Sequence, residues 1–120
     1  MGFPGHLVMK TGIDLIAQER NRQIEVEGYS AQHDSQHNVR EFIAAAITYA
    51  KSSDLSLHSE IFQPDDDWHE TNEPFYRNEV KRGWPWDEKT FKPTTPLRDL
   101  VKAGALIAAA IDRINGRKED

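Results

Sequence analysis

The cleanest hydrophobic pattern in the chain lies between residues 35 and 51. Apolar side chains recur there at the spacing of one helix face, at Val39, Phe42, Ile43, Ala46, Ile47 and Ala50. This pattern predicts an amphipathic helix with one buried stripe, and Asp34 or Ser35 is suited to cap its first turn. We expect the helix to end near Lys51, before two serines.

A second helical pattern covers residues 13 to 27. Thr11 and Asp14 have the spacing at which two side chains satisfy the free amides of a first turn, so they mark its start. One face carries Ile13, Ile16, Ala17 and Ile24, and charged residues cover the rest. Gly28 is a suitable terminator because glycine adopts the left-handed conformation without steric cost.

The last helix is predicted from residue 97 to residue 114, with Thr95 as its N-cap and Pro96 in its first turn. Its segment AGALIAAAI is apolar around nearly the whole circumference, and a helix that is apolar on all sides is buried on all sides. Two further helices and a loop scarcely enclose it. We therefore expect a second copy of the chain to cover the rest, with Gly104 and Ala108 allowing two backbones to approach closely.

Residues 52 to 95 follow neither pattern and contain four prolines, three consecutive aspartates and many aromatic residues. We expect an irregular segment with only short helical turns near residues 56–62 and 75–82, and irregular segments of this length usually have a function. The expected fold class is all-α: a small helical bundle of three main helices plus this aromatic-rich segment, assembling as a homo-oligomer. One domain would cover residues 11–120, after a flexible leader at residues 1–10.

Composition narrows the classes of partner. With 20 acidic and 15 basic residues the net charge is −5, so no overall positive field attracts the chain to nucleic acid or to an anionic membrane. Cysteine is absent, which removes disulfides, thiol catalysis and Cys-type zinc sites and fits a reducing cytoplasm. No apolar run reaches the roughly 18 residues that a membrane span needs. We expect a soluble, cytoplasmic protein.

Basic and aromatic side chains are the main candidates for a ligand site. Arg98 and Lys102 lie one turn apart at the start of the last helix, where free backbone amides also favour anions. Arginines that converge with them would form a phosphate-binding face, and flat aromatic rings nearby suit a stacked base. The candidate ligand-binding residues are Arg20, Arg22, His33, His37, Arg40, Trp84, Trp86, Arg98 and Lys102.

The same groups also have structural interpretations. The tryptophans could form a hydrophobic lid over the last helix, and the basic residues could pair with Glu19, Glu25, Glu41 or Asp99. His33 and His37 have the spacing of metal ligands, with Asp34 beside them, but they also suit the polar first turn of a helix. The acidic run at residues 65–67 lacks the alternation and the glycine of a calcium loop. We expect no metal cofactor.

Several segments resemble a family of small phage and prophage proteins. They are ERNRQIEVEGYSAQHDSQH, AAAITYA, WPWDEKTFKP and RDLVKAGALIAAAIDRI, in this order and spacing over residues 11 to 114. That family has no settled activity. The resemblance implies a viral or integrated-virus origin, and hence the cytoplasm of a bacterial host.

A more distant resemblance is to the all-α MazG-like nucleotide pyrophosphohydrolases. Their ER.RQ-like first helix and LV..AA......I last helix are matched here by residues 19–23 and 100–111. The resemblance implies magnesium held by ExxE and ExxD pairs at a triphosphate. This chain departs from that pattern, because alanines follow Glu41 where the second carboxylate belongs, and neither Asp99 nor Asp112 has an acidic partner three residues on.

We therefore expect a non-catalytic nucleotide-binding protein that sequesters a nucleotide signal of host defence. One alternative is a divergent magnesium-dependent MazG-like pyrophosphohydrolase that uses one of two clusters. Those clusters are Glu25, Glu41 and Asp112, or His33, Asp34 and His37. Another alternative is a module that binds and blocks a host protein through residues 52–95, whose aromatic content suits an interface.

Overall fold

The computed structural model describes residues 10–27, 38–62, 65–66 and 68–118. They form four α-helices: α1 (Gly12–Glu27), α2 (Val39–Phe62), α3 (Glu73–Lys81) and α4 (Pro96–Lys118). A π-helical turn, η3 (Trp68–Asn72), precedes α3, and a 3-10 turn, η4 (Glu88–Thr90), precedes α4. None of the described residues is in a β-strand, so the all-α prediction is confirmed.

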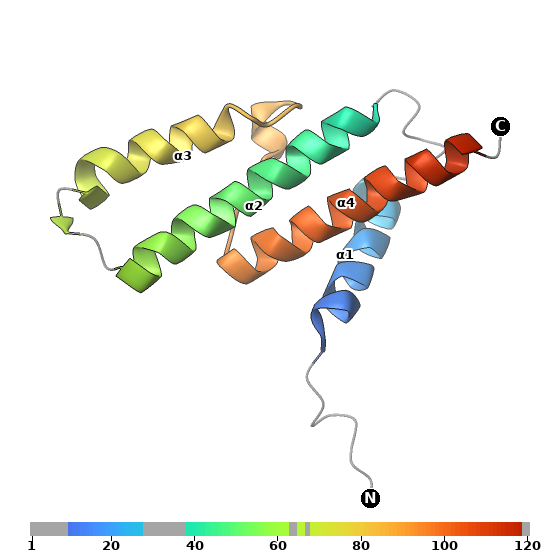
Figure 1. Cartoon of the computed structure of the whole chain (residues 1–120), viewed down its shortest axis with the longest axis horizontal. Coiled ribbons are helices and arrows are strands. Elements are labelled where there is room, and N and C mark those ends of the chain that lie inside the picture. Colours follow the sequence, from blue (N-terminus) through green and yellow to red (C-terminus); the bar gives the residue numbers. More distant parts are fainter. Residues whose placement is uncertain (1–9, 28–37, 63–64, 67, 119–120) are drawn as a thin grey trace, which may run out of the picture.

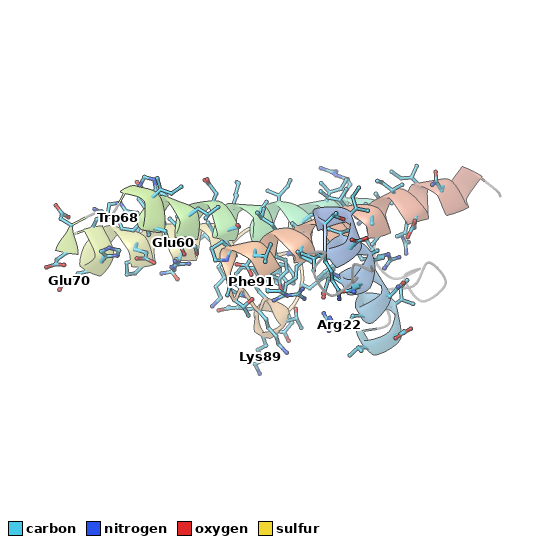
Figure 2. All side chains as sticks on the ribbon, turned by 90° about the horizontal axis from the view of Figure 1, so that it is seen from below. Arg22, Glu60, Trp68, Glu70, Lys89 and Phe91 are labelled. Carbon is cyan, nitrogen blue, oxygen red and sulfur yellow. The ribbon has the colours of Figure 1, made fainter. Side chains whose placement is uncertain are left out.

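Three of the helices lie side by side, with α2 between α3 and α4 and each antiparallel to its neighbour (Figure 1). The helix α1 packs on α4 but crosses it rather than lying along it. Figure 2 shows that α1, with Arg22, and the chain around Lys89 project from the same side of this layer. The helix α1 and the chain around Lys89 therefore lie on the same side of the three-helix layer.

Reciprocal side-chain hydrogen bonds fix the starts of α1 and α2. The amide of Thr11 donates to Asp14 Oδ2 at 3.0 Å and the amide of Asp14 donates to Thr11 Oγ1 at 3.2 Å, so the predicted start of α1 is confirmed. Asn38 and Glu41 make the same exchange at 3.0 Å in each direction. The helix α2 consequently begins at Val39 and not at residue 35, while residues 34–37 lie outside the described chain.

The helix α2 also extends eleven residues past its predicted end at Lys51, to Phe62. The two serines that were expected to stop it are buried within the helix. Ser52 Oγ donates to Asp99 Oδ2 at 3.3 Å, and Ser53 Oγ donates to the Pro96 carbonyl at 2.9 Å. Because α4 satisfies both hydroxyls, these serines join two helices instead of ending one.

The prediction of an irregular segment over residues 52–95 is therefore wrong in part. Besides the end of α2, the segment contains α3, which has Pro74 in its first turn, where a missing amide costs nothing. Among the described residues of this segment, the stretch between α3 and α4, residues 82–95, is largely irregular apart from η4. We call it the joining segment.

The buried face of α2 differs by part of a turn from the predicted stripe. Phe42 and Ala46 are buried as expected, but Ile43 and Ile47 are 43% and 48% exposed. Tyr49 is buried instead. Tryptophans of the joining segment pack edge-on against Phe42 and Tyr49, which makes that side of the helix the interior.

In α1 the expected apolar face is wrong in part, because Ile16 packs on Gly104 of α4 but other members of that face do not pack inward. Ile13 and Ile24 are exposed, whereas Glu19, Arg20 and Gln23 are buried. Hydrophobic periodicity reports only apolar burial, and α1 turns polar groups inward. Buried polar groups of this kind need partners or a ligand.

The apolar helix α4 is covered incompletely by the described part of its own chain. Leu100, Ile107 and Ile111 are each about half exposed. Gly104 does permit a close approach, but by α1: a Cβ placed there would lie 2.5 Å from Ile16 Cδ1. The prediction that this glycine receives another chain is wrong.

Over the described ranges, no helix combines the length and apolarity needed to cross a membrane.

Candidate functional site

A pocket of about 290 Å³ lies between α1, α2, α4 and the joining segment. It occupies the side of the layer on which α1 and the joining segment face each other (Figure 2). Its lining consists of Glu19, Arg22 and Gln23 of α1, Tyr49 of α2, Trp84, Thr90, Lys92 and Thr94 of the joining segment, and Arg98, Lys102 and Leu106 of α4.

The lining is positively charged in a chain whose net charge is −5. Its described cations are Arg22, Lys92, Arg98 and Lys102, against the single carboxylate of Glu19. Charges of one sign gathered in a hollow raise the local concentration of the opposite ion. The pocket therefore favours an anion, although the protein as a whole repels anions.

Glu19 organises two of these cations. Its carboxylate is almost fully buried and accepts hydrogen bonds from Arg22 Nε at 2.9 Å, Arg22 Nη2 at 2.7 Å and Arg98 Nη2 at 2.8 Å. Burial alone would raise the pKa of Glu19, but the hydrogen bonds and charges of Arg22 and Arg98 outweigh it and hold that pKa below its ordinary value. Glu19 is thus an ionised acceptor at neutral pH.

Lys102 is held by contacts with the joining segment and with α2. Its Nζ donates to the Lys92 carbonyl at 2.7 Å and lies 5.4 Å from the centre of the Tyr49 ring. Burial lowers the pKa of Lys102; Asp99 and Glu19 oppose this effect, while Arg98 and Arg22 add to it. A bound anion would stabilise the charged form of Lys102 and so raise its pKa again.

The aromatic wall is held in place by hydrogen bonds within the joining segment. Trp84 Nε1 donates to the Asp87 carbonyl at 3.1 Å and to Thr90 Oγ1 at 3.0 Å. The ring centre of Trp84 lies 5.2 Å from that of Tyr49 and 5.1 Å from that of Phe91. These contacts fix the indole before any ligand arrives.

Further along, the joining segment is tied to α2 and α4. The amide of Lys92 donates to the Tyr49 hydroxyl at 3.0 Å, and the amide of Thr94 donates to the buried Asp99 Oδ1 at 2.8 Å. Because both amides are fixed by buried groups, this wall is pre-formed. A pre-formed site loses little conformational entropy on binding.

Four of the nine candidate residues reach this pocket: Arg22, Trp84, Arg98 and Lys102. Arg22 and Arg98 also form ion pairs with Glu19, as the alternative interpretation of the basic residues expected. The convergence occurs within one chain and requires no second copy.

The other candidates lie elsewhere or outside the described residues. Arg20 is buried and pairs with Asp112 at 3.2 Å, and Arg40 is exposed on α2 away from the pocket. Trp86 packs edge-on against Phe42, with ring centres 5.4 Å apart, and so belongs to the core. His33 and His37 fall in residues 28–37, which are not described.

Sequence reasoning missed several residues of the lining. Glu19 and Gln23 lie in the same ERNRQ stretch as Arg22. Because that stretch carries the resemblance to nucleotide pyrophosphohydrolases, all of its polar residues could have been named as candidates for the site. Tyr49 lies two turns from Phe42 and continues its face. Nothing in the sequence distinguishes Lys92, whose position depends on a hydrogen bond to Tyr49.

Two of the acidic groups considered for metal binding have other partners. The Glu41 carboxylate accepts from the Asn38 amide in the cap of α2, and Asp112 pairs with Arg20. Within residues 10–27, 38–62, 65–66 and 68–118 no three His, Asp or Glu side chains are close enough to hold a metal ion together. The cluster of residues 33, 34 and 37 lies outside those ranges.

Comparison of the chain with protein-family models, curated proteins and solved structures found no match.

Proposed function

We propose that this protein binds a nucleotide-like phosphorylated compound in the pocket and does not hydrolyse it. The proposal is carried by one observation: Arg22, Arg98 and Lys102 converge with the fixed ring of Trp84 around a single cavity. Cations recognise phosphate, and an aromatic ring supplies a surface on which a base stacks.

The donors left on α4 suit a phosphate. Arg98 gives one guanidinium nitrogen to Glu19, and a guanidinium has five N–H donors in a planar fork. Lys102 gives one donor to the Lys92 carbonyl, and an ammonium has three. The two residues lie one turn apart, so both can contact the same phosphate group.

Pocket size limits the ligand. A volume of about 290 Å³ is at the lower end of the roughly 300–1,000 Å³ that small-molecule sites occupy. A mononucleotide suits this space better than a long oligonucleotide. In the viral setting implied by the sequence resemblance, tight stoichiometric binding would lower the free concentration of a host-defence nucleotide signal.

We also propose that two copies associate through an apolar face on α2 and α4. This face, the outer face, carries the exposed side chains Ile43, Ile47, Leu100, Ile107 and Ile111. By helical geometry these residues point away from the buried stripes that meet the joining segment.

The charges at the edge of the outer face support a second copy as the occupant. Arg40 and Asp54 are exposed and lie two helical turns before and after Ile47 on the same stripe of α2. Antiparallel packing of α2 on its own copy about Ile47 would place Arg40 against Asp54 of the partner subunit twice. A two-fold interface requires such self-complementarity.

Binding is tested by calorimetry with nucleoside mono-, di- and cyclic phosphates. We expect one class to bind and Lys102→Gln to weaken it by about 1.5–3 kcal/mol, the contribution of a charge-assisted hydrogen bond. The matched control is Lys89→Gln, an exposed position outside the pocket lining, which should leave the affinity unchanged.

The proposal is wrong if folded wild-type protein gives no heat with any member of the panel, or if the two lysine variants behave alike. Release of pyrophosphate or monophosphate with magnesium or manganese would favour the hydrolase alternative. A pull-down that retains one host protein, with every nucleotide silent, would favour the interaction-module alternative.

A further inference from the structure

One buried polar atom in the pocket lining has no partner. Gln23 is 3% exposed and lies on α1 among the residues that line the pocket. Its side-chain oxygen, Oε1, makes no hydrogen bond to any part of the chain that the structure describes. Buried polar atoms in folded proteins are nearly always satisfied, so an exception at a ligand site requires an explanation.

The neighbouring carboxylate decides which end of the Gln23 amide is paired and which end is left without a partner. Gln23 Nε2 lies 3.5 Å from Glu19 Oε2, the limit of a hydrogen bond. Glu19 is ionised and can only accept, so the NH₂ end of the amide must face it. Exchanging the two ends would place two acceptor oxygens together. The Oε1 atom is therefore held as an acceptor.

Phosphate does not satisfy this atom. At neutral pH the oxygens of a phosphate group are overwhelmingly acceptors, as Oε1 is. The cations that suit the phosphate, Arg98 and Lys102, supply donors, whereas Gln23 Oε1 is one more acceptor. The partner of Gln23 must come from another part of the ligand.

We propose that Gln23 Oε1 accepts a hydrogen bond from an N–H or O–H group of the ligand, so that the pocket selects nucleotides by a donor on the base or the ribose. This inference rests on the proposed function and adds a specificity-determining residue to it. A site that hydrogen-bonds a ligand group discriminates strongly against an analogue lacking that group, because its own buried atom is then left unpaired.

The first experiment changes the ligand and leaves the protein intact. The probes are the four ribonucleoside 5′-monophosphates, each compared by calorimetry with 2′-deoxy and 3′-deoxy forms and with a base analogue that lacks the amino or imino hydrogen. We expect the wild type to bind the parent at least about tenfold more tightly than one of these analogues. The analogue that loses affinity identifies base or ribose as the donor.

The second experiment changes the acceptor. Gln23→Met keeps the length of the side chain and removes the oxygen. The variant should therefore bind the parent ligand and the analogue with an affinity ratio of about one. Lys102→Gln is the matched control, because loss of a phosphate contact should weaken parent and analogue equally and leave their ratio unchanged.

Equal wild-type affinity for the parents and all three kinds of analogue would overturn the inference and leave the proposed function standing. A wild-type preference that survives in folded Gln23→Met would also overturn it. Absence of binding by every probe, with no heat from the nucleoside di- and cyclic phosphates either, would overturn the proposed function together with the inference. If Gln23→Met fails to fold by circular dichroism, the wild-type comparison decides alone.

Discussion

At the scale of the residue, Glu19 gives the pocket its charge arrangement. A single buried carboxylate holds Arg22 and Arg98 close together, although their like charges repel. The same carboxylate fixes the orientation of the Gln23 amide. One acidic side chain therefore positions groups suited to a phosphate and a group suited to a donor.

Replacing Glu19 by Gln should destabilise the protein at neutral pH. The amide oxygen cannot accept from both arginines as the carboxylate does, and removing one partner of a buried ion pair costs about 3–5 kcal/mol. Both arginine side chains are 42% exposed, so solvent screening reduces the expected loss to about 1–3 kcal/mol. Urea unfolding at pH 7 measures it.

The pH dependence of that loss is a separate prediction. Because the pKa of Glu19 is lower in the folded state than its ordinary value of 4.5, its stabilisation is present above about pH 4.5 and is lost as the pH falls through the folded pKa. The difference in unfolding free energy between wild type and Glu19→Gln should therefore shrink below pH 4.5. A difference that stays constant down to pH 3 would contradict this assignment.

At the scale of the element, helix contacts depend on small and hydroxylated residues. Ser52 and Ser53 join α2 to the start of α4, and alanines on both helices allow the backbones to approach. Gly104 gives α1 room to cross α4, because Ile16 occupies the space of the missing side chain. This crossing places the polar face of α1 at the pocket.

Two glycines of α4 form a matched pair for testing the crossing. Gly116→Ala meets no atom within 4 Å and should raise the unfolding free energy by about 0.5–1 kcal/mol, the helix-propensity gain. Gly104→Ala should lower it by about 1–2 kcal/mol, since the new Cβ would lie 2.8 Å from Ile16 Cγ1.

Thermal unfolding measures both variants, and adding Ile16→Ala to Gly104→Ala should relieve the collision. Equal stabilisation by the two glycine substitutions would mean that α1 does not pack on Gly104.

At the scale of the whole molecule, the two sides of the helical layer differ. One side carries α1 and the joining segment, which line the pocket (Figure 2). The outer face, by helical geometry, points away from the buried stripes that meet the joining segment. Apolar side chains gathered on one face of a protein usually mark an interaction surface. Because the pocket is formed within one chain, association through the outer face would leave it open.

Sedimentation velocity at micromolar concentration tests the proposed association. We expect the wild type to sediment as a dimer or larger, and Ile107→Glu combined with Ile111→Glu to sediment as a folded monomer. Ile13→Glu is the control: Ile13 is 80% exposed at the start of α1, so its substitution should not change the assembly. A monomeric wild type would contradict the proposal.

The local sequence pattern was enough to predict the fold class and several of the helix boundaries. The cap of α1 and the start of α4 depend on residues three positions apart, such as Thr11 with Asp14 and Thr95 with Arg98. Contacts this local are visible in a sequence because neighbouring residues supply both partners. The extension of α2 was missed because the partners of its serines lie more than forty residues away.

The sequence by itself determined that the chain is helical. It also identified the tryptophans and several basic residues as candidates for a ligand site. Only the tertiary structure decided that Trp84 lines the pocket while Trp86 packs in the core. It also decided that Glu19 and Gln23 of α1 face inward. Helical periodicity follows from hydrogen bonds between residues four apart, whereas the choice of inward face depends on which distant element supplies a partner.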